Sequence, residues 1–153
     1  MNKTVTWGKV EEICDELAKN MLADGCKGVL LGLGRGGLVP AVILSHKLKC
    51  PLHPIIWQTR DGGRKDKLLS LLLSIEDETT IYVVDDINDS GETFSQVTDE
   101  LFTLLCDYKK TSKIRVRTVS LFTRYSSKYC SDYFGETVCS DVFLEFPWET
   151  YNE

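Results

Sequence analysis

Two adjacent carboxylates near the middle of the chain are the clearest sign of chemistry in this sequence. Asp85 and Asp86 follow the apolar, β-branched run Ile81-Tyr82-Val83-Val84, which predicts a buried strand that ends at the acids. Mostly small and polar residues come next, and from Thr93 onward the apolar residues recur at helical spacing. The expected local structure is a strand, an acidic tip, a short loop and the start of a helix.

That local structure suits the binding of a sugar phosphate. The start of a helix offers unpaired backbone N–H groups and the positive end of its dipole, and small residues let a phosphate approach the backbone. Asp85 and Asp86 would lie at the carboxyl end of the strand, where open α/β sheets bind ligands, and could hold sugar hydroxyls and Mg²⁺. The expected phosphate contacts form one run, with hydroxyl donors at two positions: Asn88, Asp89, Ser90, Gly91, Glu92 and Thr93.

Residues 81–93 resemble the phosphoribosyl-pyrophosphate (PRPP) signature of the type I phosphoribosyltransferases, in which an apolar strand precedes two acids and an Asp-Ser/Thr-Gly-x-Thr loop. The resemblance implies that PRPP is a substrate and that Asp85 and Asp86 hold Mg²⁺ as a cofactor. The alternative is a surface strand–turn–helix with incidental acids. It would leave two like charges side by side without a partner, which costs free energy.

A second glycine-rich segment lies closer to the amino terminus. A predicted strand, Gly28–Leu33, leads into Gly34-Arg35-Gly36-Gly37 and then into a predicted helix from Leu38 to Leu48. Pro40 fits this prediction because a proline is tolerated in the first turn of a helix. Three of the glycines also satisfy the dinucleotide-binding spacing G-x-G-x-x-G, which indicates a different class of function: Gly32, Gly34 and Gly37.

Two features disfavour a dinucleotide site. The dinucleotide fingerprint expects an acid near the end of the second strand, and the predicted strand Leu52–Trp57 is followed by no acid before Asp61. An arginine within the glycine segment also suits pyrophosphate, through bidentate, charge-assisted hydrogen bonds. By the resemblance, the pyrophosphate of PRPP is bound by Arg35, Gly36 and Gly37, and Gly34-Arg35 is the candidate for a non-proline cis peptide bond.

The polar, basic segment from Gln58 to Lys67, followed by a short predicted helix from Leu68 to Ile75, occupies the place of the mobile lid in this family. The resemblance implies a lid over about residues 58–75 that closes over the site and excludes water. Arg64 is the residue that matches a family arginine reaching the pyrophosphate. Many members begin the lid with Ser-Tyr, whereas this chain has Gln58-Thr59.

The carboxyl-terminal part of the chain carries the expected base-binding residues, within about residues 123–149. A predicted strand from Ile114 to Phe122 ends at Thr123-Arg124, where purine phosphoribosyltransferases have a lysine that donates to the 6-oxygen of the base. Residues 141–149 resemble the tail of the xanthine-guanine phosphoribosyltransferases. The resemblance assigns base stacking to Phe143 and a backbone contact with the base to Leu144.

Composition narrows the class of protein. The chain has 153 residues, enough for one domain with a substantial core, and its net charge of −5 disfavours nucleic acid as a partner. No apolar run reaches membrane-spanning length, and residues 7–20 are too mixed and charged for a signal peptide. The six cysteines have no metal-binding spacing, so buried free thiols in a reducing cytoplasm are expected.

These observations predict a single domain, residues 1–153, with an open, mainly parallel twisted α/β sheet flanked by helices. The resemblance implies a reaction that transfers 5-phosphoribosyl from PRPP to an oxopurine base and releases pyrophosphate. Arg35 would stabilise the leaving pyrophosphate, and Asp89 would act as the general base or electrostatic partner of the purine. A homodimer or homotetramer is expected. A pyrimidine substrate, or a non-catalytic PRPP- or nucleotide-sensing regulator that binds nucleic acid, remains the alternative.

Overall fold

The computed structural model describes residues 1–57 and 63–149, without the side chains of residues 63–65. Its main feature is a five-stranded sheet in which every neighbouring pair is parallel. The predicted parallel sheet is therefore confirmed. In spatial order its strands are β3 (Leu52–Ile55), β2 (Gly28–Leu33), β4 (Thr79–Asn88), β5 (Ile114–Arg124) and β6 (Tyr133–Val138).

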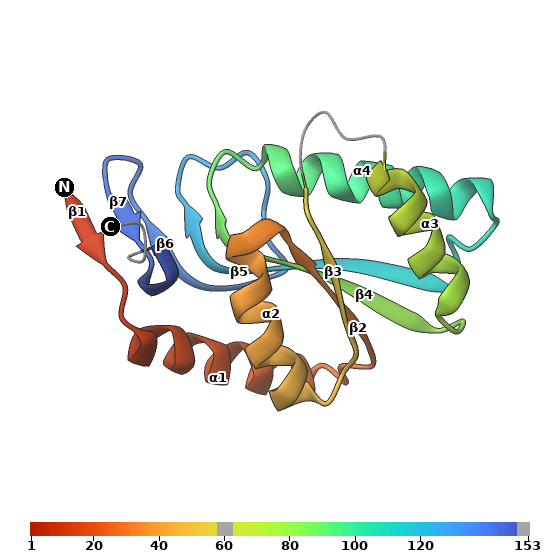
Figure 1. The fold of residues 1–153 in the computed structure, drawn as a ribbon, viewed down its shortest axis with the longest axis horizontal. Helices are drawn as coiled ribbons and strands as arrows, with labels where there is room; N and C mark the ends of the chain where they lie inside the picture. The colour runs from red at the N-terminus through yellow and green to blue at the C-terminus, as the bar shows by residue number, and fades with distance from the viewer. Residues whose placement is uncertain (58–62, 150–153) are drawn as a thin grey trace.

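Two helices cover each face of the sheet, so the molecule has three layers (Figure 1). One face carries α1 (Trp7–Ala23) and α2 (Gly34–Leu48), and the other carries α3 (Gly63–Ser74) and α4 (Glu92–Asp107). Each face has its own apolar core, because a central parallel strand turns alternate side chains toward opposite layers. In β4, Tyr82 and Val84 pack toward α1 and α2, while Ile81 and Val83 pack toward α3 and α4.

The sequence predicts an amphipathic helix from Trp7 to Ala23, with Thr6 as its cap and Asp24-Gly25 as its exit, and the structure confirms this prediction in α1. The Oγ1 atom of Thr6 accepts a hydrogen bond from the N–H group of Lys9 at 3.1 Å and so caps the start of α1. Asp24 caps the end, and Gly25 has a φ of +75°, a conformation in which glycine avoids strain. Local sequence chemistry alone accounts for this element.

The prediction that α2 begins at Leu38 is wrong, because the helix begins at Gly34. Gly34 turns the chain out of β2 with a φ of +55°, and no peptide bond among the described residues is cis, so the predicted cis bond at Gly34-Arg35 is also wrong. Pro40 consequently lies inside α2 rather than in its first turn. Glycine has a low helix propensity, and here tertiary packing against β4 overrides it.

The central strand is longer than predicted, because it does not end at the two acids. β4 continues through Asp85 and Asp86 to Asn88, because its backbone remains paired with β5, with Asp85 opposite Ser120 and Asn88 opposite Thr123. β2 ends earlier, since Gly32 is its last residue paired with β4, opposite Val84. The acids therefore project beyond the end of β2, beside the start of α2.

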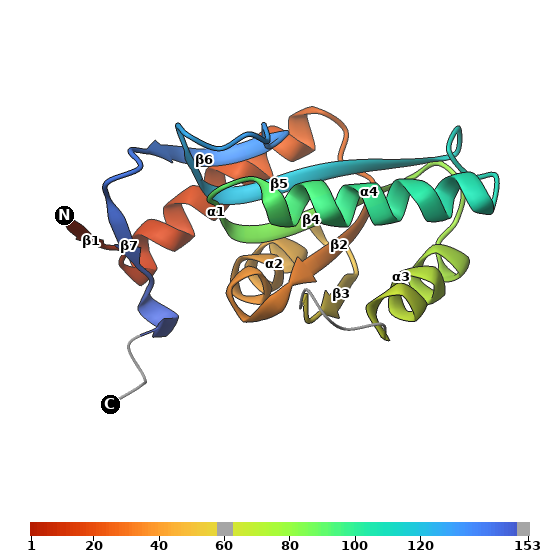
Figure 2. The ribbon, with the colours of Figure 1, turned by 90° about the horizontal axis from the view of Figure 1, so that it is seen from above.

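A second, two-stranded parallel sheet joins the two ends of the chain (Figure 2). β1 (Asn2–Thr4) pairs with β7 (Phe143–Glu145), and the short helix η1 (Pro147–Glu149) follows β7. The sequence predictions include neither β1 nor β6. Within the described residues, no helix combines the length and the apolar character that a membrane crossing would need.

Candidate active site

The paired acids occupy the carboxyl end of the central strand. The N–H group of Asp86 donates to Oδ1 of Asp85 at 2.9 Å, and the N–H group of Ile87 donates to Oδ1 of Asp86 at 2.8 Å. Each carboxylate is thus anchored to the backbone by one oxygen. The second oxygen of Asp86 lies against Gly36 at the start of α2.

The surroundings of these acids favour a bound cation. Burial, and secondarily the charge of Asp86, raises the pKa of Asp85 well above its usual value, and burial also raises the pKa of Asp86. A cation beside them would remove this penalty. Among the described residues no group of three or more His, Cys, Asp or Glu side chains is arranged to hold a metal. Two carboxylates fit Mg²⁺, which commonly takes one or two carboxylates and completes its shell with phosphates and water.

The glycines at the start of α2 allow the helix to approach the acids. A Cβ atom on Gly36 would lie 2.7 Å from Cγ of Asp86 and closer still to its Oδ2 atom. A Cβ atom on Gly37 would lie 2.5 Å from the carbonyl oxygen of Val84. Neither position has room for a side chain. The predicted glycine segment is therefore placed directly against the carboxylates.

A cavity of about 480 Å³ opens beside these glycines. Its lining includes Arg35, Gly36 and Asp86 from the predicted site, together with Trp148 and Glu149 from η1. Arg35 is exposed and has no ion-pair partner in the described part of the chain, so its guanidinium is available to an anion. Trp148 also packs against the rings of Trp7 and Phe146.

The loop between β4 and α4 forms a small cradle of about 50 Å³, lined by the predicted residues from Asn88 to Gly91 and by Thr93. Gly91 has a φ of +91°, and a Cβ atom there would lie 2.7 Å from the backbone nitrogen of Tyr129, so glycine is required twice over. The first N–H groups of α4 have no partner within the helix. The cradle can therefore bind one small anionic group.

Two predicted phosphate-binding residues use their side chains elsewhere. Asn88 is buried, donates from Nδ2 to the carbonyl oxygen of Tyr129 at 2.7 Å, and accepts from the hydroxyl of Ser127 at 2.9 Å. The side chain of Glu92 is exposed and accepts a hydrogen bond from Gln96 at 3.1 Å. Asn88 still lines the cradle, whereas Glu92 does not line it and donates its N–H group to the Oγ atom of Ser90 at 3.2 Å.

A wider cleft of about 480 Å³ adjoins the cradle and adds residues that sequence reasoning missed. Asp89, Ser90 and Glu92 line it together with Ser126 and Lys128, and the N–H group of Lys128 donates to the carbonyl oxygen of Ser90 at 3.0 Å. The position of Lys128, shortly after the end of β5, could have indicated its place in the site, because the carboxyl ends of parallel strands meet at one edge of the sheet.

The expected base-binding residues are linked to the cradle through one ion pair. Nε of Arg124 donates to Oδ1 of Asp89 at 2.6 Å, and Nη1 donates to the carbonyl oxygen of Val142 at 2.6 Å. Phe143 follows directly in β7 and is 61% exposed. The N–H group of Phe143 faces β1, where it donates to Met1, so the backbone of Leu144 faces away from β1.

Arg64 lies in α3, and its side chain falls outside the described residues, as do residues 58–62 of the predicted lid. The remainder of that segment contains the predicted helix, which extends from Gly63 to Ser74. All six cysteines lie within the described residues and are free thiols, as predicted, although only Cys14 is buried.

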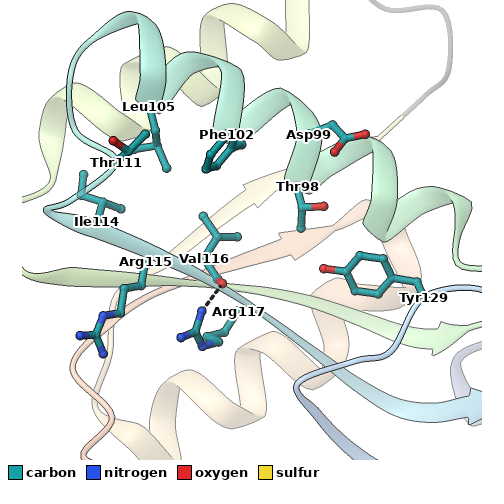
Figure 3. A pocket seen from close by; sticks show the side chains of 10 residues that line it. All are labelled: Thr98, Asp99, Phe102, Leu105, Thr111, Ile114, Arg115, Val116, Arg117 and Tyr129. Carbon is teal, nitrogen blue, oxygen red and sulfur yellow. Dashed lines mark hydrogen bonds between the residues drawn. The ribbon is translucent and has the colours of Figure 1, made fainter.

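A separate cavity of about 420 Å³ lies between α4 and β5 (Figure 3). Its lining mixes apolar side chains, such as Phe102 and Val116, with polar ones, such as Thr98 and Asp99, and the guanidinium of Arg115 points away from α4. It contains neither the paired acids nor a glycine turn. The acidic edge of the sheet therefore remains the candidate active site.

Comparison with known proteins agrees with this geometry. A xanthine-guanine phosphoribosyltransferase of Vibrio parahaemolyticus is 28% identical over 147 residues, which cover 95% of this chain and 87% of that protein. The purine phosphoribosyltransferase of Pyrococcus horikoshii has a similar fold, with a TM-score of 0.75 at 24% identity over 99% of this chain and 96% of that chain. The xanthine-guanine-hypoxanthine phosphoribosyltransferase of Helicobacter pylori gives a TM-score of 0.76 at 22% identity, over 98% and 95% of the two chains. The family model for the phosphoribosyl transferase domain matches residues 5–150, nearly the whole chain, and the protein belongs to that family.

Proposed function

We propose that this protein is a purine phosphoribosyltransferase, which transfers 5-phosphoribosyl from PRPP to an oxopurine base and releases pyrophosphate. One observation carries the proposal. A phosphate-sized cradle, a pair of half-buried carboxylates and a cavity with an available arginine lie along one edge of the sheet. These three features match the 5-phosphate, the ribose and the pyrophosphate of PRPP. The names of the relatives favour guanine, xanthine or hypoxanthine as the acceptor.

In this proposal each part of the edge has one task. Backbone N–H groups of the cradle, with the hydroxyls of Ser90 and Thr93, bind the 5-phosphate. The carboxylates of Asp85 and Asp86 bind the ribose hydroxyls and hold Mg²⁺, which would neutralise charge on the pyrophosphate when bound. Arg35, beside Gly36 and Gly37, stabilises the negative charge that develops on the departing pyrophosphate.

The acceptor base binds on the other side of the cradle. Phe143 offers an exposed ring on which a purine can stack, and the carbonyl group of Leu144 accepts from an exocyclic amine. Asp89 has one carboxylate oxygen bonded to Arg124, so its second oxygen is left for the N7 proton of the purine. Taking that proton as the new glycosidic bond forms would complete the transfer.

The proposal is tested by pyrophosphate release from PRPP and Mg²⁺ with separate bases. Release with guanine, xanthine or hypoxanthine, and its loss in an Asp89→Asn variant, is the expected result. Release only with uracil or orotate would move the acceptor class to pyrimidines. Binding of PRPP without release for any base would indicate a sensor rather than an enzyme.

A further inference from the structure

Arg124 is held in place by three hydrogen bonds to other parts of the chain. Its Nε atom donates to Oδ1 of Asp89 at 2.6 Å, and its Nη1 atom donates to the carbonyl oxygens of Cys139 at 2.9 Å and Val142 at 2.6 Å. Only 11% of the Arg124 side chain is exposed, whereas 67% of the Asp89 side chain is exposed. The largely buried Arg124 side chain therefore holds the exposed carboxylate of Asp89 in one position.

The two carbonyl groups belong to a single turn. The N–H group of Val142 donates to the carbonyl oxygen of Cys139 at 3.2 Å, which closes a β-turn over residues 139–142. One nitrogen of Arg124 thus binds the first and the last residue of the turn. Phe143, the proposed stacking residue, is the next residue in the chain. The position of β7 relative to Asp89 consequently depends on this side chain.

The chemistry of the guanidinium group decides what else Arg124 can do. Arginine has five N–H donors in a rigid planar fork, and the three contacts use the one on Nε and the two on Nη1. The two donors on Nη2 take no part in these three contacts. A lysine carries its three donors on a single nitrogen atom, so it cannot span a carboxylate and two carbonyl groups with the same geometry.

We propose that Arg124 is a positioning residue, which fixes the general base Asp89 and the 139–142 turn relative to each other. The inference rests on the proposed function, because Asp89 and Phe143 take their roles from it. In purine phosphoribosyltransferases, which this chain resembles, a lysine at this position donates directly to the 6-oxygen of the base. Arg124 instead sets the distance between the carboxylate that takes the proton and the segment that stacks on the base.

The first test needs no substrate. Hydrogen–deuterium exchange of the backbone amides of Val142 and Phe143 is compared between the wild-type protein and the Arg124→Lys variant. Loss of the two carbonyl contacts is expected to speed exchange about tenfold at these amides, while amides in α1 keep their rates. Arg115→Lys is the matched control, because Arg115 lies on the same strand, is exposed and points away from α4 (Figure 3). If Arg124→Lys does not fold, Arg124→Gln provides the same measurement.

The second test is kinetic. In Arg124→Lys, kcat is expected to fall about tenfold and KM for the base to rise, while KM for PRPP is unchanged. In the double variant, Arg124→Lys with Asp89→Asn, the fold reduction in kcat is expected to be much smaller than the product of the two single reductions. Both substitutions disturb the same interaction. Unchanged exchange, or a loss confined to KM for the base, would overturn the inference in favour of direct base reading. Faster exchange with normal kinetics would overturn the positioning role.

The two tests separate the inference from the function on which it rests. A wild-type protein that forms no nucleotide with any base refutes the proposed function, and the positioning role in catalysis falls with it. An active wild-type protein whose Arg124→Lys variant behaves normally refutes the inference alone.

Discussion

Adding one methyl group at Gly36 is expected to damage the site more than the fold. In Gly36→Ala, the new Cβ atom would lie 2.7 Å from Cγ of Asp86, well inside the 3.4–4 Å of ordinary van der Waals contact. The carboxylate of Asp86 would have to turn away, and its hydrogen bond from the N–H group of Ile87 would be lost. Overpacking of this kind costs about 1–3 kcal/mol of folding free energy. Displacing a carboxylate that holds the ribose and Mg²⁺ should lower kcat/KM for PRPP about 100-fold.

Steady-state pyrophosphate release and thermal unfolding measure the two effects separately. Gly37→Ala provides the contrast, because its Cβ atom would meet the backbone oxygen of Val84, which has no rotamer by which to move. That variant should lose mainly stability. Gly8→Ala is the control, since Gly8 is exposed in α1 and its nearest neighbour would be 3.8 Å away. Removing a helical glycine there should add about 0.5–1 kcal/mol. A Gly36→Ala variant with kcat/KM within about twofold of wild type would refute the reasoning.

Three further changes test individual residues. Asp89→Asn is expected to remove most turnover while calorimetry still detects PRPP binding, and loss of that binding would contradict the assigned role. Because burial and then the charge of Asp86 raise the pKa of Asp85, ionised Asp85 disfavours the folded state, and stability falls as the pH rises through that pKa. Asp85→Asn should therefore raise the unfolding temperature at mildly alkaline pH and weaken Mg²⁺-dependent PRPP binding, whereas an unchanged unfolding temperature would contradict the pKa argument. Phe143→Ala should raise KM for the base with little loss of stability, since the ring is 61% exposed, and an unchanged KM would remove Phe143 from the base site.

Local patterns in the sequence were sufficient for elements whose cause is local. The apolar stripe, the Thr6 cap and the Asp24-Gly25 exit all belong to α1, and the structure confirms each of them. The buried strand Gly28–Leu33 has its predicted bounds for the same reason. The parallel sheet follows from the alternation of such strands with helices.

Elements that depend on distant partners were not predictable from local patterns. The sequence predicted a loop at residues 34–37, because glycine disfavours helices. In the structure these residues form the first turn of α2, in contact with Asp86 and Val84. The sequence predicted that the central strand ends at the two acids, because they are charged. Pairing with β5 extends β4 beyond them. β1 and β7 are three-residue strands from opposite ends of the chain. No window of sequence contains both.

The candidate site shows the same division. The acids and the phosphate loop lie in one continuous motif, so residue spacing alone indicated their chemistry. The glycine segment around Arg35 also indicated a phosphate contact. The role expected of Phe143 came from the family resemblance alone, since that residue has no distinctive local pattern. Two features could be found only in the structure. Glu149 lines the same cavity as Asp86, and Arg124 forms hydrogen bonds to the 139–142 turn.

Internal competition between bases tests the central claim most directly. The protein is incubated with PRPP, Mg²⁺ and an equimolar mixture of guanine, xanthine, hypoxanthine, uracil and orotate, and the nucleotides formed are identified by mass spectrometry. The account predicts purine nucleoside 5′-monophosphates, no pyrimidine nucleotide, and no product from Asp89→Asn. Exclusive formation of a pyrimidine nucleotide, or the absence of any nucleotide from the wild-type protein, would contradict it.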